Sequence, residues 1–466
     1  MPGKFIIHPQ HAPPRFEPIG KFQITRDPGC INCGKCIAVC IYDVHSRSEE
    51  DYREMADPVD YRCKNCFNCI QECPKGVLSM SINPQYQELG DALYAPEIIT
   101  SIMSQAERGE IPVLGGGYGG PFSGPGFDAM WTDMSEIVRP TRDGIHGREY
   151  ISTAVDLGRK PQDVTDLRFD ESGNPITNIP PTVEVKLPIL FDRLPFSPAG
   201  DHILLSLAAA AAELGTFVVI ERDRCSPALL PFSNHIVESL SPEDQSWRKI
   251  VDIAKSHSVL ELIYSPELKS LPESLKGINP DLIVFVRLET FDDVEPTVTQ
   301  LCQSGVDVVH IHVDPYNDMA PGCLPEIVQR VHTHLVGLGM RDSVTIIASG
   351  EIAAAEHVPK AIILGADAVA VDIPALIAME CTVCKECVAG KKCPRELESI
   401  DPRWGIQRIV NLMASWHNQL LEVLGAMGLR EVSRLRGEMG RAMFKEKLDE
   451  EILANILTSG GKLCSR

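Results

Sequence analysis

The second half of the chain alternates short apolar runs with amphipathic stretches. From Val183 onward the runs are rich in β-branched residues, and the stretches between them, such as Ile203–Leu214 and Leu324–Leu338, have helical spacing. Strands that alternate with helices in this way are typical of a parallel sheet. The predicted strands are Val183–Phe191, Thr216–Glu221, Asn234–Glu238, Val259–Ser265, Leu282–Leu288, Val306–Val313, Val344–Ser349 and Ala368–Asp372.

Eight such strands within one segment favour a closed (β/α)8 barrel over residues 183–380. An open, doubly wound sheet is the alternative that the same pattern leaves open. Beyond the barrel, residues 401–457 are predicted to be helical. There, apolar residues fall on one face of a helix that would pack against the barrel: Ile409, Leu412, Met413, Trp416, Leu420 and Leu424.

The first 182 residues have a different amino-acid composition. Residues 1–20 are rich in proline and histidine, and residues 21–83 are dense in cysteine. Residues 84–182 are rich in glycine, proline and aspartate, apart from a helical stretch near Ala95–Arg108, and are predicted to form a connector. The connector segment "LGGGYGG" matches a dinucleotide-binding fingerprint, but "PFSGPG" follows where a helix is required, so nicotinamide binding there is rejected.

Twelve of the sixteen cysteines lie in three tight groups. The first two groups have the spacing in which three thiolates wrap one iron–sulfur cubane and the fourth ligates the neighbouring cubane. Two [4Fe–4S] clusters are therefore predicted in a ferredoxin-like domain at 21–83, whereas four-cysteine zinc sites usually use two separated pairs. The predicted ligands are Cys30, Cys33, Cys36 and Cys73 for one cluster, and Cys63, Cys66, Cys69 and Cys40 for the other.

The third group, "CTVCKECVAGKKCP", is predicted to hold a third iron–sulfur cluster within 381–400. Its ligands would be Cys381, Cys384, Cys387 and Cys393, and four thiolates favour the [4Fe–4S] form. Zinc is the alternative for this group. The four scattered cysteines are interpreted as inert thiols: Cys225, Cys302, Cys323 and Cys464.

Composition narrows the range of partners. The formal net charge is −20, which argues against a nucleic-acid or anionic-membrane surface and is compatible with a redox protein as partner. No apolar run is long enough to span a bilayer, and the first residues lack the apolar core of a secretory signal. A cytoplasmic location is therefore expected.

Three long segments carry a family resemblance. They are "GPFSGPGFDAMWTDMSEIVRPTRDGIHGREYISTAVDLGRK", "GADAVAVDIPALIAMECTVC" and "RIVNLMASWHNQLLEVLGAMGLREVSRLRG". Together with the cysteine motifs, they resemble the ferredoxin-containing, archaeal-type glutamate synthase large subunits over Lys21 to about Gly437. The resemblance implies an FMN barrel that is fed by iron–sulfur clusters and reduces 2-iminoglutarate. It also implies Arg287 as the catalytic cation facing the flavin, and Ser349, Gly350 and Gly365 as cofactor-binding residues.

The barrel loops depart from the family pattern. Phosphate-facing glycines are absent after several strands, and Glu351 and Asp372 stand where glycines are expected. His310, His312 and Asp314 alternate at one strand end, where they would be either core residues or a site. Two functions remain: a glutamate synthase-like enzyme that retains FMN, or a non-catalytic electron-transfer subunit that has lost it and docks to another redox protein.

Overall fold

A computed structural model of the chain describes residues 5–111, 126–134, 151–160, 168–173, 180–198, 200–244, 247–266, 268, 271–289, 293–314, 316 and 323–445. The chain divides into two compact units. The cysteine unit comprises 13–100 with 382–384, and the barrel unit comprises 1–12, 101–381 and 385–466. The "LGGGYGG" segment, most of the loop at 313–322, and residues 446–466 lie outside the described residues.

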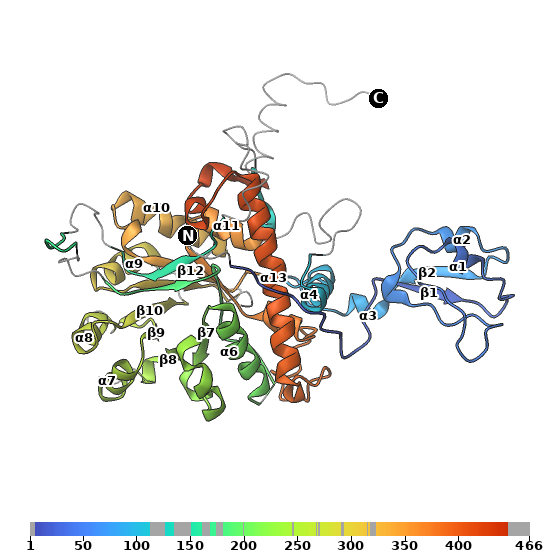
Figure 1. Cartoon of the computed structure of the whole chain (residues 1–466), viewed down its shortest axis with the longest axis horizontal. Helices are drawn as coiled ribbons and strands as arrows, with labels where there is room; N and C mark the ends of the chain where they lie inside the picture. The colour runs from blue at the N-terminus through green and yellow to red at the C-terminus, as the bar shows by residue number, and fades with distance from the viewer. Residues whose placement is uncertain are drawn as a thin grey trace, which may run out of the picture. The chain divides into compact units, whose positions relative to one another are not determined.

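The cysteine unit, blue in Figure 1, is a small α/β domain built around its thiols. Strands β1 (Phe22–Arg26) and β2 (Leu78–Ile82) pair antiparallel, and the short helices α1 (Lys35–Val39) and α2 (Asn68–Gln71) each follow a cysteine loop. The core is small. Ile24, Val44, Cys69 and Leu78 are buried, and further cysteines and several aliphatic side chains pack on them.

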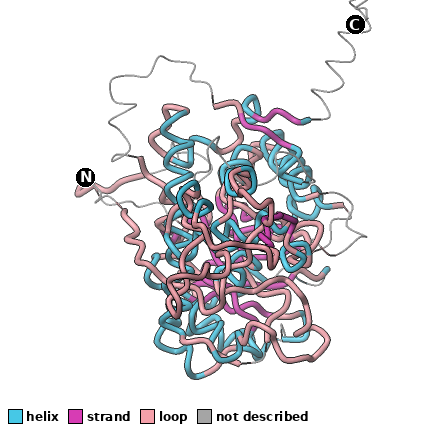
Figure 2. The backbone as a smooth tube through the Cα atoms, turned by 90° about the vertical axis from the view of Figure 1, so that its right-hand side faces the viewer, coloured by secondary structure: helices cyan, strands magenta, loops and turns pink. Residues whose placement is uncertain are grey.

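Eight parallel strands close the barrel in chain order, so the predicted (β/α)8 architecture is confirmed. The strands are β6 (Ile189–Phe191), β7 (Val218–Glu221), β8 (Ile236–Leu240), β9 (Val259–Ile263), β10 (Ile283–Leu288), β11 (Val308–His312), β12 (Thr345–Ser349) and β13 (Ala368–Val371). Helices lie around these strands (Figures 1 and 2): α6 (His202–Leu214), α7 (Trp247–Ser256), α8 (Leu271–Ile278), α9 (Val294–Gln303), α10 (Leu324–Gly337) and α11 (His357–Ile363).

The first predicted strand is in fact two elements. Residues Thr182–Val185 form β5, which pairs antiparallel with β4 (Val155–Gly158) outside the barrel, and the barrel strand β6 begins only at Ile189. Pro188 lies between β5 and β6 and has no N–H to donate to a neighbouring strand. The predicted strand is therefore interrupted where the chain leaves its pairing with β4 and enters the barrel.

A 25-residue helix, α13 (Pro402–Ala426), covers the barrel and holds the end of α4 (Pro96–Arg108). Its buried Arg408 donates hydrogen bonds to the carbonyls of Ala12 and Met103, and Asn411 donates to those of Gln10 and Ala106. The Ala106 carbonyl lies in the last turn of α4, and those of Gln10 and Ala12 lie outside helices and strands. The buried Arg408 and Asn411 side chains therefore find acceptors that regular structure leaves free.

The sequence predicts helices throughout the segment after α13, but the described part of this segment also contains a strand. Residues Ala442–Phe444 form strand β14, which pairs antiparallel with β3 (Met130–Thr132) of the connector. The period-two pattern is too short in both places to be recognised from sequence. Among the described residues, no helix combines the length and the apolar character needed to cross a membrane.

The turn after β12 depends on a glycine. Gly350 has φ of +107°, and a Cβ there would lie 1.7 Å from the carbonyl oxygen of Val313. We therefore expect Gly350→Ala to lower the unfolding free energy by several kcal/mol, more than the roughly 1–3 kcal/mol of a strained φ alone. Gly277→Ala is the matched control, because a Cβ there meets nothing within 4 Å. Chemical unfolding measures both, and equal stability of the two variants would contradict the expectation.

Candidate functional site

A buried ion pair spans the interior of the barrel. Asp192, directly after β6, and Arg287, on β10, are both almost completely shielded from solvent. The Arg287 Nη1 and Nη2 atoms donate to the two carboxylate oxygens of Asp192 at 2.7 and 3.2 Å, and Nε donates to Glu289 at 2.8 Å. Such a forked geometry is specific to arginine. The positive charge predicted at position 287 is therefore present, but two carboxylates already neutralise it.

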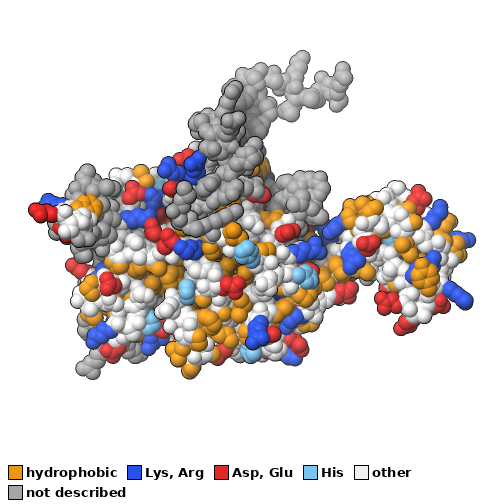
Figure 3. Space-filling view, in the orientation of Figure 1, with side chains coloured by type: hydrophobic (Ala, Val, Ile, Leu, Met, Phe, Trp, Pro, Cys, Tyr) orange, Lys and Arg blue, Asp and Glu red, His pale blue; other side chains and the backbone are white. Residues whose placement is uncertain are grey.

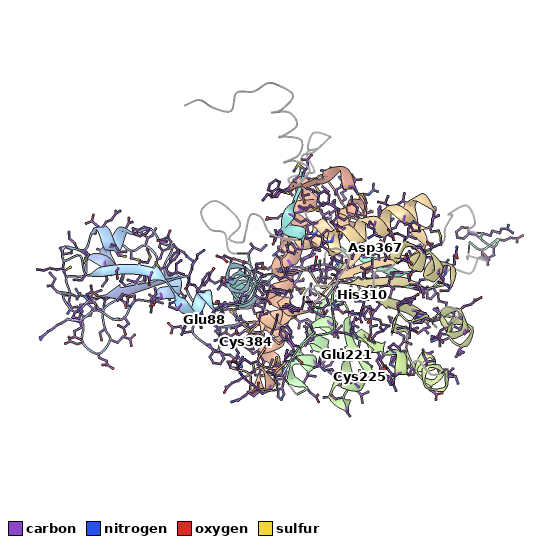
Figure 4. The ribbon with its side chains drawn as sticks, turned by 180° about the vertical axis from the view of Figure 1, so that it is seen from behind. Glu88, Glu221, Cys225, His310, Asp367 and Cys384 are labelled. Atoms are coloured by element: carbon purple, nitrogen blue, oxygen red, sulfur yellow. The ribbon has the colours of Figure 1, made fainter. Side chains whose placement is uncertain are left out.

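A network of hydrogen bonds beside this pair joins four further strands, β8, β9, β11 and β12. His310 on β11, labelled in Figure 4, has Nδ1 2.6 Å from Glu261 Oε2 and Nε2 2.9 Å from Ser349 Oγ. His312 Nδ1 lies 2.9 Å from the same Ser349 oxygen, and the Ser239 hydroxyl donates to Glu261. Of the alternating residues His310, His312 and Asp314, the two histidines thus join one buried network, whereas Asp314 is exposed and accepts a hydrogen bond from Tyr316.

Electrostatics fix the protonation states of the carboxylates. Burial alone would raise the pKa of Asp192, but Arg287, His310 and His312 outweigh it and hold this pKa well below its ordinary value. The pKa of Glu261 is likewise lowered, because His310 and Arg287 more than offset its burial. Burial lowers the pKa of His312, with the Arg287 charge adding to the effect. The network therefore consists of charged carboxylates facing one permanent cation and a neutral His312.

The two acids that replace glycines, Glu351 and Asp372, each bind the start of a helix. The Leu324 N–H, at the start of α10, donates to Glu351 Oε2 at 3.0 Å. Asp372 is the N-cap of α12 (Ile373–Ala378), where its Oδ1 accepts from the Ile373 N–H, and its buried Oδ2 has no hydrogen-bond partner among the described residues. Carboxylates thus occupy helix starts where a phosphate would otherwise accept hydrogen bonds.

The two carboxyl groups disfavour the phosphate of FMN at this end of the barrel. The Arg287 cation is paired, and two helix starts at the carboxyl ends of the strands are taken by Glu351 and Asp372. An ionised carboxylate about 4 Å from a phosphate charge would repel it by roughly 4 kcal/mol at an effective dielectric constant of about 20. Burial raises the pKa of both Glu351 and Asp372, so protonation of either group would relieve part of this repulsion. The need for glycine at position 350 is explained by the close approach of the Val313 carbonyl, so this glycine is not evidence for a bound ligand.

The structure does not bring all the predicted flavin residues together. Ser349 and Gly350 lie at the carboxyl end of β12, beside the buried network. Gly365 instead precedes β13, at the amino end of its strand near Asp367, which Figure 4 labels. There the Gly365 carbonyl accepts from Arg341, and a Cβ would collide with His332. The FMN role of these residues stays a prediction.

A cavity in the cysteine unit gathers four predicted iron ligands. Cys40, Cys63, Cys66 and Cys69 line it together. Burial, with the charges of Cys63, Cys40 and Cys66 adding to its effect, raises the pKa of Cys69 to about 11. Four thiols that share one cavity and repel one another as thiolates match the grouping that the spacing predicts, with Cys40 crossing over from the first motif. A bound cationic cluster would relieve this repulsion.

The remaining thiols of the first two motifs differ in environment. Burial raises the pKa of Cys36 although the Arg26 charge opposes it, and the Cys30 thiolate adds to the rise. At Cys73, burial is outweighed by backbone N–H groups of Val77, Lys75, Gly76 and Leu78, so that its pKa is lowered. A ring of backbone donors around one sulfur is suited to a thiolate.

One further group of possible metal ligands is explained without a metal. Asp128, Glu356 and His357 present ligand atoms within 4.8 Å of one another. However, the Ala353 N–H donates to His357 Nδ1, which places the ring proton on Nε2, and Nε2 donates it to Asp128 at 3.0 Å. A nitrogen that carries a proton cannot ligate a metal, so these residues form a structural hydrogen-bond network.

Similarity to known proteins agrees with this architecture. Residues 251–430 match the conserved region in glutamate synthase, and residues 23–74 match a 4Fe-4S dicluster domain. An archaeal-type glutamate synthase [NADPH] of Dehalococcoides mccartyi is 27% identical, covering 90% of this chain and 94% of that protein. The archaeal glutamate synthase [NADPH] of Archaeoglobus fulgidus is 26% identical, covering 92% and 95%.

Among solved structures, a lactate oxidase of Pediococcus acidilactici covers 74% of this chain and 94% of its own, at 12% identity and a TM-score of 0.40. That likeness is too low to support an inference. The dicluster match and the closed barrel define an iron–sulfur oxidoreductase of the glutamate synthase type. The chain is a homologue of the archaeal-type glutamate synthases over about nine-tenths of its length.

Asp372 gives the barrel a testable pH dependence. Burial, together with the Asp192 charge, raises its pKa to about 7 from an ordinary 3.8. Between these pH values the folded state holds a proton that the unfolded state has released, so stability falls as pH rises from about 4 to about 7. We expect Asp372→Asn, which keeps the helix cap, to exceed the wild type in unfolding free energy by up to roughly 4 kcal/mol above pH 7.

The same variant should gain little near pH 4, where the wild-type carboxyl is also neutral. Asp281→Asn, at an exposed position, is the control and should show no such pH-dependent gain. Unfolding midpoints at a series of pH values provide the comparison. Parallel profiles for Asp372→Asn and the wild type would show that this carboxyl does not titrate in the way its burial requires.

Proposed function

We propose that this chain is an enzyme that reduces the imine of 2-oxoglutarate and ammonia to glutamate, with electrons entering through the cysteine unit. The observation that carries this proposal is the match to relatives named glutamate synthase over 94% and 95% of their length, with the dicluster segment and the barrel in one chain. Reduction of the C=N bond forms one C–H and one N–H bond, and consumes two electrons and two protons. Iron–sulfur clusters deliver the electrons singly.

A third iron–sulfur cluster, held by Cys381, Cys384, Cys387 and Cys393, would extend the path. Backbone geometry supports it. In each of the three motifs, the residues immediately before and after the second cysteine have left-handed backbone conformations. These residues are Asn32 and Gly34, then Asn65 and Phe67, then Val383 and Lys385, with φ of 54° and 77°, 60° and 62°, and 57° and 57°.

The third loop is informative because its residues do not favour this shape. A left-handed φ is a strained conformation for a β-branched residue such as Val383, and costs of the order of 1–3 kcal/mol. Strain of this kind persists where surrounding structure or a ligand fixes it. The shared shape therefore favours the same cubane ligation in all three motifs over a zinc site.

The buried network in the barrel is suited to holding and moving protons. When Glu261 is ionised and the His310 ring is neutral, the tautomer with the proton on Nδ1 donates to Glu261, and Nε2 accepts from the Ser349 hydroxyl. Ser349 Oγ in turn accepts from His312 Nδ1–H. This directed chain of hydrogen bonds leads from His312, which is about one-eighth exposed, to the fully buried Glu261, so a proton could be passed along it by rotation of one hydroxyl.

A second function is favoured by one observation. Glu351 and Asp372 bind helix starts that would otherwise be open to a phosphate, which disfavours FMN at this end of the barrel. A barrel without FMN would lack the carrier that joins single-electron clusters to a two-electron reduction. The chain would then be an electron-transfer subunit that passes electrons to a redox protein partner in the cytoplasm. The visible face mixes acidic and basic side chains (Figure 3), so charge alone does not identify that partner.

Anaerobic purification followed by iron, FMN and activity measurements separates the two functions. For the enzyme we expect about one FMN per chain, and glutamate formation from 2-oxoglutarate and ammonium with a reduced ferredoxin or viologen as donor. About twelve irons without FMN, and without glutamate formation after FMN is added, would instead establish the electron-transfer subunit. Glu261→Gln should then leave cluster reduction unchanged, whereas in the enzyme it should slow glutamate formation by about 10²–10⁴-fold.

The third cluster is tested by Cys387→Ala. We expect this variant to lose about four of about twelve irons, because one thiolate ligand of a cubane is removed. Cys225→Ala is the matched control, a half-buried thiol outside the three motifs, and should retain all the iron. Iron analysis and the electron paramagnetic resonance spectrum of the reduced protein measure the loss. An unchanged iron content in Cys387→Ala would refute the assignment.

A further inference from the structure

One side chain lining the four-cysteine cavity is unlike its neighbours. His45 is only 3% exposed and lines the cavity together with Cys40, Cys63, Cys66 and Cys69. Neither of its ring nitrogens has a hydrogen-bond partner among the described residues. Other deeply buried histidines do have partners. His310 bonds to Glu261 and Ser349, His357 to Asp128, and His417 to Thr153.

An unpartnered buried imidazole is costly. Leaving a buried donor or acceptor without a partner costs about 1–3 kcal/mol, and native proteins rarely tolerate it. The ring must nevertheless carry at least one N–H, because a neutral imidazole has one donor and one acceptor nitrogen. The donor therefore needs an acceptor that the described part of the protein does not supply.

Arg26 presents a second unsatisfied donor group in the same unit. Its Nη1 donates to the carbonyls of Met55 and Ala56, while its buried Nε and Nη2 have no hydrogen-bond partner among the described residues. Its charge acts on both Cys36, a predicted ligand of the first cluster, and His45. The Arg26 cation and the unpartnered N–H groups of Arg26 and His45 therefore form an environment that favours an anionic acceptor.

We propose that His45 donates a hydrogen bond to a sulfur of the second [4Fe–4S] cluster, either a bridging sulfide or a ligating thiolate, and thereby raises the reduction potential of that cluster. A cluster in this cavity would place an anionic sulfur acceptor beside the unpartnered ring N–H of His45. Hydrogen bonds to cluster sulfur stabilise the reduced, more negative state and are a principal control of the potential. His45 is a positioning residue here, since it ligates no iron. The inference rests on the dicluster assignment and not on the chemistry of the barrel.

The test compares cluster potentials in intact, cluster-loaded protein. Redox titration followed by electron paramagnetic resonance resolves the waves of the individual clusters. We expect His45→Phe, which keeps a ring but has no donor, to lower one wave so that the ratio of reduced to oxidised cluster falls about tenfold at a fixed solution potential. That shift equals about 59 mV for one electron. The reduction potentials of the other clusters should stay unchanged, and they serve as an internal control.

His45→Gln restores an amide N–H and should recover most of the shift, which a purely structural role for the ring would not produce. A second measurement needs no substitution. Labelling the wild type with ¹⁵N-histidine should produce a ¹⁵N coupling to the spin of the reduced cluster in pulsed electron paramagnetic resonance. A ¹⁵N coupling lost in His45→Phe supports the proposal even if that variant loads less iron.

Unchanged potentials in His45→Phe, or no ¹⁵N coupling in the wild type, would overturn it. A wild-type protein that binds no iron would overturn the dicluster assignment and this proposal with it. By contrast, loss of glutamate formation with normal clusters would affect the proposed function alone.

Discussion

The pairing of Asp192 with Arg287 is the constraint on which the barrel interior depends. Asp192 directly follows β6 and Arg287 lies on β10, and these strands are four apart in a ring of eight, so the hydrogen bonds cross the barrel instead of following its wall. A buried charge without its partner costs about 3–5 kcal/mol, so neither residue can change alone. Glu261, His310 and Ser349 extend the network to three more strands. The space that a flavin barrel keeps for its cofactor is bordered here by fixed charges that satisfy one another.

The cysteine loops show a constraint of a different kind, set by covalent geometry. In each loop, left-handed residues flank the second cysteine on both sides. In the first two loops the sequence assists at three of the four positions, since asparagine and glycine accept this conformation readily, and Phe67 is the exception. In the third loop, neither valine nor lysine favours it. The third loop therefore adopts its shape against local preference, in keeping with the third cluster proposed above.

Much of the fold was predictable from sequence, and the failures have physical reasons. Short apolar runs located every barrel strand, because buried parallel strands are almost uniformly apolar. The split at Pro188 and the β3–β14 pair were not predicted, since a strand of three or four residues leaves too little pattern. In the site, cysteine spacing predicted which thiols gather, with Cys40 joining the second motif. The partners of Arg287 and the isolation of His45 depend on residues distant in sequence, which spacing cannot reveal.

The internal caps at α10 and α12 have a consequence for how this protein responds to its surroundings. A barrel that leaves helix starts open gains stability when an anionic ligand binds, and its folded fraction then follows the ligand supply. Here the Glu351 and Asp372 side chains supply those acceptors covalently, at a fixed effective concentration. These two helix starts therefore need no external anion to satisfy their N–H groups, and their stability does not depend on ligand supply.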